Sequence, residues 1–299
     1  MLARRNKRIS ISGLLICSLL YGSLAWVAIA GPQQTQTDVL RVPELEAGFR
    51  LLYELKPAEA RTQFAARQKT HPEDPLSSAA EAASYLFEEC YRQGILTSEF
   101  FLDDDRFIGK IPVKADGALR KAFFAASKRA QDLSRLRLKT SPDDANALFA
   151  MTLSVGLQAD YASLIDKQQL DSLRMIGEAD KLAKKLLVVA PEGADAYLTL
   201  GTANYIIGSL PAGKRFFLRL AGIRGDKRVG IKQIETAAAS GRYLRPFAKI
   251  LLGLAALREK KPDVARTQLT ELVAEFPQNP LFASELAKLN AISPVPKPH

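Results

Sequence analysis

The chain has 299 residues, of which 47% are apolar and 25% are charged, a composition typical of a folded protein with a sizeable core. The two cysteines are Cys17, which lies in the N-terminal apolar stretch, and Cys90. Without that stretch Cys90 has no partner for a disulfide bond, and we expect Cys90 to be a core residue. Two histidines, His71 and His299, leave little material for a metal site or a histidine-based triad. The net charge of +10 falls to +6 without the four basic residues of 1–30, which is too mild for a dedicated nucleic-acid binder.

Residues 1–30 have the pattern of a targeting segment. Basic residues at positions 4, 5, 7 and 8 precede an uncharged apolar run that ends in Ala28-Ile29-Ala30, the type of site that signal peptidase cleaves. We prefer cleavage after Ala30, and an uncleaved anchor is the alternative because the run over 9–30 is long enough to span a bilayer. Both interpretations predict an exported protein, either in the bacterial periplasm or in the inner membrane with residues 31–299 facing the periplasm.

Residues 39–292 predict an all-α domain, between a polar linker at 31–38 and a disordered, proline-rich tail at 293–299. Alternating β-type patterns are almost absent, and alanine and leucine are abundant. In each of four proline-containing turns, proline ends one helix and a following polar residue can cap the next. The turns are His71–Pro75, Ser141–Asp144, Ala190–Gly193 and Phe276–Pro280. Pro72 and Pro142 are 70 residues apart, close to two repeat units of about 34, whereas the later intervals indicate insertions.

The spacing of small and bulky residues resembles the tetratricopeptide repeat. Glycine and alanine occupy positions where two helices touch, and bulky residues fill the spaces beside them. The best first helix lies in 194–208, with matches at Tyr197, Leu200, Gly201, Ala203, Tyr205 and Gly208. Further matches are Gly48, Leu51, Ala60, Phe64 and Pro72; Leu252, Gly253, Ala265, Leu269 and Pro277; Ala130 with Pro142; and Ala179 with Pro191. The resemblance departs where a second small residue is expected, at Arg67, Arg137, Leu186 and Leu272, and over 73–127 and 209–246.

This resemblance implies an α-solenoid of stacked helix-turn-helix repeats that binds another protein or peptide. In the family, one stripe of each first helix packs inward and another lines a groove, unless residues 209–246 fill that groove. The residues that this register places in the groove are Asn146, Phe149, Leu153, Asp195, Leu198, Thr202 and Tyr205. We therefore expect a binding scaffold and not an enzyme.

A fainter resemblance covers 216–282. The turn Gly225-Asp226 and the segment Phe276–Phe282 are similar to a eukaryotic tetratricopeptide-like family related to the inclusion-body clearance proteins of the mitochondrial outer membrane. That similarity implies a fold, but it does not imply a catalytic activity. Helix capping explains the same residues, because Gly222 and Gly241 can each end a helix and Asp226 can begin one.

Motifs for catalysis or cofactor binding fail in their details. Gly208–Arg215 has the glycine spacing of a phosphate-binding loop, but Arg215 replaces the magnesium ligand and a helix precedes the segment. The three carboxylates of Asp103–Asp105 lack the alternation of a calcium loop and indicate a helix cap or a solvated loop. We expect no cofactor, no metal ion and no small-molecule substrate.

Two basic stretches remain, and both are compatible with an ordinary solvated helix face. The alternative is attraction to an anionic membrane surface or to an acidic protein partner, which makes a lipid-binding structural protein the second functional hypothesis. The expected export argues against nucleic acid as the partner of these stretches. The stretches comprise Arg120, Lys121, Lys128, Arg129, Arg135, Arg137 and Lys139, and Lys214, Arg215, Arg219, Arg224, Lys227 and Arg228.

Overall fold

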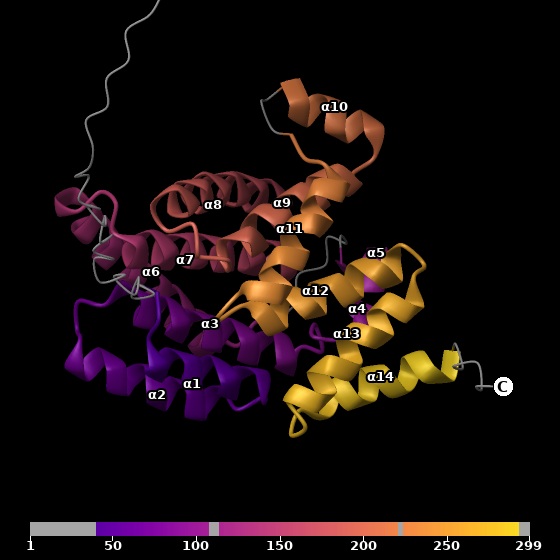
Figure 1. Cartoon of the computed structure of the whole chain (residues 1–299), viewed down its shortest axis with the longest axis horizontal. Coiled ribbons are helices and arrows are strands. Elements are labelled where there is room, and N and C mark those ends of the chain that lie inside the picture. Colours follow the sequence, from indigo (N-terminus) through magenta and orange to yellow (C-terminus); the bar gives the residue numbers. More distant parts are fainter. Residues whose placement is uncertain (1–39, 108–113, 221–223, 293–299) are drawn as a thin grey trace, which may run out of the picture. The chain divides into compact units, whose positions relative to one another are not determined.

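The computed structural model describes residues 40–107, 114–220 and 224–292, which belong to one compact unit, Asp38–His299 (Figure 1). These ranges are all-helical, as predicted, with no strand. The helices are α1 (Pro43–Tyr53), α2 (Pro57–Thr70), α3 (Pro75–Arg92), α4 (Ser98–Leu102), α5 (Asp104–Phe107), α6 (Gly117–Thr140), α7 (Ala145–Leu164), α8 (Gln169–Val189), α9 (Ala196–Ser209), α10 (Ala212–Leu220), α11 (Lys227–Ser240), α12 (Arg245–Arg258), α13 (Pro262–Glu275) and α14 (Pro280–Ile292).

The targeting segment 1–30, the linker 31–38 and the tail 293–299 lie outside the described residues. Within the described part of the chain, no helix combines the length and the apolar character needed to cross a bilayer.

The proline-containing turns use the capping residues that the sequence predicts in three of four places. Asp74 accepts a hydrogen bond from the Leu76 N–H at 3.1 Å, and Asp144 accepts one from the Ala147 N–H at 2.8 Å. Asn279 accepts from the Leu281 N–H at 2.8 Å. Each bond satisfies a backbone donor that the first helical turn leaves without a partner. Asp195 precedes α9 in the same way but does not cap it.

Five helix pairs carry the fold: α1 with α2, α3 with α6, α7 with α8, α9 with α11, and α12 with α13 (Figure 1). The second helix of each pair also contacts the first helix of the next pair, and α13 contacts α14. The alanines that the repeat pattern places in the second helices are buried in these contacts, at 1% exposure or less: Ala60, Ala130, Ala179 and Ala265. Small residues therefore lie where the helices pack, as the spacing predicted.

The departures from the repeat pattern have two structural solutions. Arg67 pairs with the capping Asp74 at 3.2 Å, and Arg137 pairs with the capping Asp144 at 2.6 Å. Each arginine thus joins the end of one helix to the start of the next. Leu186 and Leu272 are instead completely buried in the core.

The interpretation of 70 residues as nearly two repeat units is wrong. Residues 75–140 form a single long helix pair, α3 and α6, with α4 and α5 inserted between its two helices. Phe100 of α4 is buried in an aromatic cluster with Phe123 and Tyr161, which fixes the insertion to the fold. The sequence did not indicate the insertion of α4 and α5. The later interval between Pro191 and Pro277 did indicate an insertion, and it contains α10, which lies inside the pair of α9 and α11.

The last helices of the chain contact the first. Asn279 Nδ2 donates to the Tyr53 carbonyl oxygen at 2.8 Å, and the rings of Tyr53 and Phe276 lie 5.6 Å apart. One large hydrophobic cluster runs from Leu40 to Phe282 and includes residues of α1, α3, α7, α9, α11 and α12. This core joins segments that are more than 200 residues apart in sequence.

The α9–α11 contact supplies a test of the close packing. A Cβ atom added to Gly230 would lie 2.5 Å from the Tyr205 backbone nitrogen and 2.7 Å from the Gly201 carbonyl oxygen. We predict that Gly230→Ala lowers the free energy of unfolding by about 2 kcal/mol, because two backbones must separate. Urea unfolding followed by circular dichroism measures the change.

The matched control is Gly177→Ala. Gly177 lies inside α8, and no atom lies within 4 Å of the added Cβ. This variant should gain up to about 1 kcal/mol from helix propensity. Equal effects of the two substitutions would contradict the tight contact at Gly230.

Candidate functional site

Four of the seven residues that the repeat register places in a groove are buried in the core. Phe149 and Leu153 of α7 are 1% and 8% exposed, and Asp195 and Leu198 at the start of α9 are 3% and 5% exposed. Asn146, Thr202 and Tyr205 are partly buried. The sequence left open whether this groove is open or filled by residues 209–246, and at these four residues it is filled. The prediction that the seven residues bind a partner stays a prediction.

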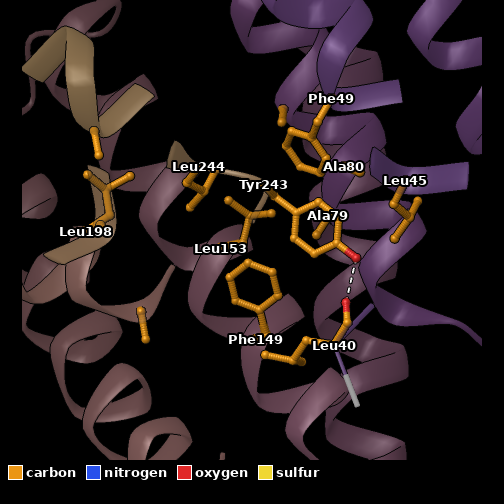
Figure 2. Packing of buried hydrophobic residues seen from close by; sticks show 14 of the residues in the cluster. Leu40, Leu45, Phe49, Ala79, Ala80, Phe149, Leu153, Leu198, Tyr243 and Leu244 are labelled. Atoms are coloured by element: carbon orange, nitrogen blue, oxygen red, sulfur yellow. Dashed lines mark hydrogen bonds between the residues drawn. The ribbon is translucent and has the colours of Figure 1, made fainter. Parts of the chain in front are cut away.

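The segment Gly241–Leu244, between α11 and α12, fills this space; we call it the 241–244 loop. Figure 2 shows the Tyr243 ring between Phe149 of α7 and Phe49 of α1. The centroid of the Tyr243 ring lies 5.9 Å from the centroid of the Phe149 ring, in a stacked geometry, and 5.2 Å from the centroid of the Phe49 ring. Tyr243 Oη donates to the Leu40 carbonyl oxygen at 2.5 Å and accepts from the Val42 N–H at 3.0 Å. The loop thus ties the start of the domain to the interior of the helix pairs.

Asp195 holds the backbone of the 241–244 loop. Its carboxylate accepts hydrogen bonds from the N–H groups of Arg242 at 3.0 Å, Tyr243 at 3.3 Å and Leu244 at 2.8 Å. Burial raises the pKa of Asp195, whereas these backbone hydrogen bonds act to lower it. A Cβ at Gly241 would lie 2.9 Å from Asp195 Oδ1, so the close approach of carboxylate and loop requires glycine here.

Two of the three half-buried residues, Asn146 and Tyr205, have different environments. Asn146 Oδ1 is buried without a hydrogen-bond partner among the described residues. Tyr205 lies on α9 beside the ion pair between Lys227 and Glu259, and burial raises the pKa of its hydroxyl. The structure brings Phe149 and Asp195 together at the 241–244 loop, but it gives Asn146 and Tyr205 separate surroundings.

A cleft of about 620 Å³ opens beside the 241–244 loop, between α1, the start of α12 and the end of α13. Aromatic side chains form its floor, and charged side chains surround its opening. The floor comprises Phe49, Tyr53, Tyr243 and Phe276, and the charged residues are Glu46, Arg50, Arg242, Arg245 and Glu275. Sequence periodicity could not find this site, because its walls come from both ends of the domain.

The charges at the cleft are arranged in pairs, with an excess of arginine. Arg242 pairs with Glu46 at 2.8 Å, and Arg245 pairs with Glu275. Arg50 donates to the Glu275 carbonyl oxygen at 3.1 Å, and its guanidinium lies 5.2 Å from the centre of the Phe276 ring. The Arg50 side chain is 55% exposed, more than the other two arginines at the cleft. It can therefore offer hydrogen-bond donors to a carboxylate that enters from solvent.

The chemical motifs that the sequence rejected have structural roles in the described residues. Asp103 accepts from the N–H groups of Asp105 and Arg106 at the start of α5, which confirms the helix-cap interpretation. The segment Gly208–Arg215 begins in the last turn of helix α9, so a helix and not a strand leads into it, also as expected. Cys90 is 3% exposed and packs in the core. The described ranges contain no group of three or more His, Cys, Asp or Glu residues arranged to hold a metal ion.

Comparisons with known proteins give no match, either to a family model or to a curated protein sequence.

Removal of the Asp195 carboxylate should destabilise the fold more than loss of an ordinary cap. We predict that Asp195→Ala lowers the free energy of unfolding by about 3 kcal/mol, because three N–H groups of the 241–244 loop lose their acceptor. Asp144→Ala, which removes the cap of α7, should cost about 1 kcal/mol. Chemical denaturation of both variants under one set of conditions gives the comparison, and equal losses would exclude a special role of Asp195.

A partly buried carboxylate, Asp160, predicts a pH dependence. Asp160 lies on α7 seven residues after Leu153, on the same helix face, and burial raises its pKa to about 7. Burial raises the pKa of the Cys90 thiol on α3, and the charges of Asp160 and Glu89 raise it further. Between about pH 4 and pH 7 the folded state therefore binds more protons at Asp160 than the unfolded state does.

Stability should accordingly fall as pH rises through this range, and Asp160→Asn should remove that part of the fall. Because Asp160 keeps some contact with solvent, we expect a gain on the order of 2 kcal/mol for the variant at pH 8 and little difference at pH 4. Unfolding by urea across this pH range measures the difference from wild type. The exposed Asp171→Asn should show no such trend; a parallel trend in both variants would refute the assignment to Asp160.

Proposed function

We propose that this chain is a non-catalytic binding scaffold of the tetratricopeptide type, which binds an acidic segment of another protein in the cleft beside the 241–244 loop. The single observation that carries this proposal is the combination of an aromatic floor with the exposed Arg50 at the opening. An arginine fork binds carboxylates in a defined geometry, and aromatic residues with arginine are the side chains that dominate protein interfaces.

The packing of the helices supports the repeat part of the proposal. Each helix pair contacts the next through α2 and α3, α6 and α7, α8 and α9, and α11 and α12. The first helices α1, α3, α7 and α9 also contact one another in succession. Stacking of this kind, with each pair touching its neighbours, is how a solenoid buries its apolar faces.

The charge of the cleft supports an acidic partner. Three arginines and two glutamates line it, and both glutamates already pair with arginine. Arg50 also pairs at 3.3 Å with Glu54, which is 13% exposed and has a second partner in Lys56. Glu54 therefore keeps an ion-pair partner when Arg50 turns to a ligand. Export to the cell envelope, which rests on residues 1–30, would place the partner in the same compartment.

Selection from a library of random twelve-residue peptides displayed on phage tests the proposal with the purified protein as target. We expect the enriched peptides to carry Asp or Glu, and their binding to weaken with added salt. Arg50→Ala should weaken binding of a selected peptide about 10-fold, since one charged anchor is removed. Fluorescence anisotropy of the labelled peptide gives the Kd.

The control variant is Arg174→Ala, which removes an arginine that is 82% exposed on α8 and does not line the cleft. Its affinity should match wild type. Neutral or basic peptides as the selected ligands, or equal affinities for Arg50→Ala and wild type, would rule out the cleft as the site. Unchanged melting temperatures show that each variant is folded.

A further inference from the structure

Helix α10 is an insertion that the helix pair around it does not need. Three residues suffice to join α1 to α2 and α12 to α13, whereas the connection from α9 to α11 runs from Leu210 to Asp226 and contains α10. Unlike the helices of the five pairs, α10 is not among the helices that pack extensively on a neighbour. The insertion of α4 and α5 differs, because it is fixed by buried Phe100 and by the ion pair between Asp104 and Arg258.

The side chains of α10 form two exposed rows. Phe216 and Leu220, one turn apart, are 59% and 71% exposed and make an apolar row. Arg215 and Arg219, also one turn apart and exposed, make a basic row beside it. An open hollow of about 280 Å³ is lined by Ala212, Arg215, Phe216 and Arg219. A helix with one apolar and one basic row matches the boundary between acyl chains and headgroups of a bilayer.

The charge around α10 is of one sign. The segment 209–225 contains four basic residues and no acidic residue. In the described part of the chain, no carboxylate forms an ion pair with Arg215, Arg219 or Arg224, and Arg215 donates only to the neutral Gly208 carbonyl oxygen. The first acid after the segment, Asp226, is occupied as the cap of α11. The arginine charges are therefore available to external anions.

We propose that α10 docks on a membrane surface that contains anionic phospholipid. Phe216 and Leu220 enter the interface between headgroups and acyl chains, and Arg215 and Arg219 contact lipid phosphates while their aliphatic stems stay in the apolar layer. An acidic protein groove would account for the arginines, but the continuous exposed apolar row favours the bilayer. The inference is independent of the cleft and of its partner.

A reporter on α10 itself tests the proposal in the full chain. Leu220→Cys, labelled with an environment-sensitive fluorophore in a Cys17→Ser background, reports the polarity at the apolar row, and buried Cys90 resists labelling. We expect a blue shift and quenching by brominated lipid when vesicles with one third phosphatidylglycerol are added, and neither with pure phosphatidylcholine. A label at Val188→Cys, a position on α8 that is 82% exposed, is the matched control and should not respond.

The charge variant is Arg215→Gln with Arg219→Gln. Its apparent affinity for the anionic vesicles should fall roughly 30-fold, since each basic residue near the surface contributes about 1 kcal/mol. An equal response of the Val188 label, an equal response to pure phosphatidylcholine, or no effect of the charge variant would overturn the proposal. The same blue shift with soluble polyphosphate or with DNA would also overturn it, because it would reveal an anion site that needs no bilayer.

Discussion

The hydrogen bonds between Asp195 and the 241–244 loop are the constraint on which the arrangement of this domain depends. A connection between helices normally runs over the surface, because buried backbone groups need partners. Here the Asp195 carboxylate accepts from three successive N–H groups, and Tyr53 Oη donates to the Tyr243 carbonyl oxygen at 2.9 Å. With these donors and acceptors satisfied, the Tyr243 ring can occupy the space between α1 and α7 (Figure 2). The same carboxylate is then no longer available to cap α9.

The cleft results from the position of the 241–244 loop between α1 and α7. The 241–244 loop brings the start of α12 to α1, and contacts of Tyr53 with Phe276 and Asn279 bring the end of α13 to the same place. The aromatic floor therefore serves the core, whereas Arg50 is 55% exposed and contacts the floor only at its edge, through the Phe276 ring and the Glu275 carbonyl oxygen. A substitution of Arg50 should consequently change binding more than stability, whereas a substitution of Phe49, Tyr53 or Tyr243 should change both.

The two insertions of the fold show opposite uses of apolar residues. The α4–α5 insertion buries Phe100, and Lys288 of α14 pairs with Glu99 there at 3.1 Å, so this insertion strengthens the link between the middle and the end of the domain. Helix α10 leaves its apolar row in contact with water and concentrates basic residues beside it. An exposed apolar face that the fold does not cover is a feature of interaction sites. The difference is tertiary, because both insertions are rich in phenylalanine.

The sequence by itself determined the all-helical class, the four proline-containing turns and the burial of the repeat alanines, because helix capping and helical periodicity are local. It also indicated the caps at Asp74, Asp144 and Asn279. It could not show that α3 and α6 form one long pair, since spacing alone does not distinguish two short units from one interrupted pair. The burial of Phe149 and Asp195, and the meeting of Arg50 with Glu275, were decided by the tertiary structure. The burial of Phe149 and Asp195 depends on a loop nearly 50 residues from Asp195 and about 200 from Leu40, whereas Arg50 meets a carbonyl oxygen about 225 residues away. The carboxylate that anchors the loop is, in sequence, indistinguishable from a helix cap.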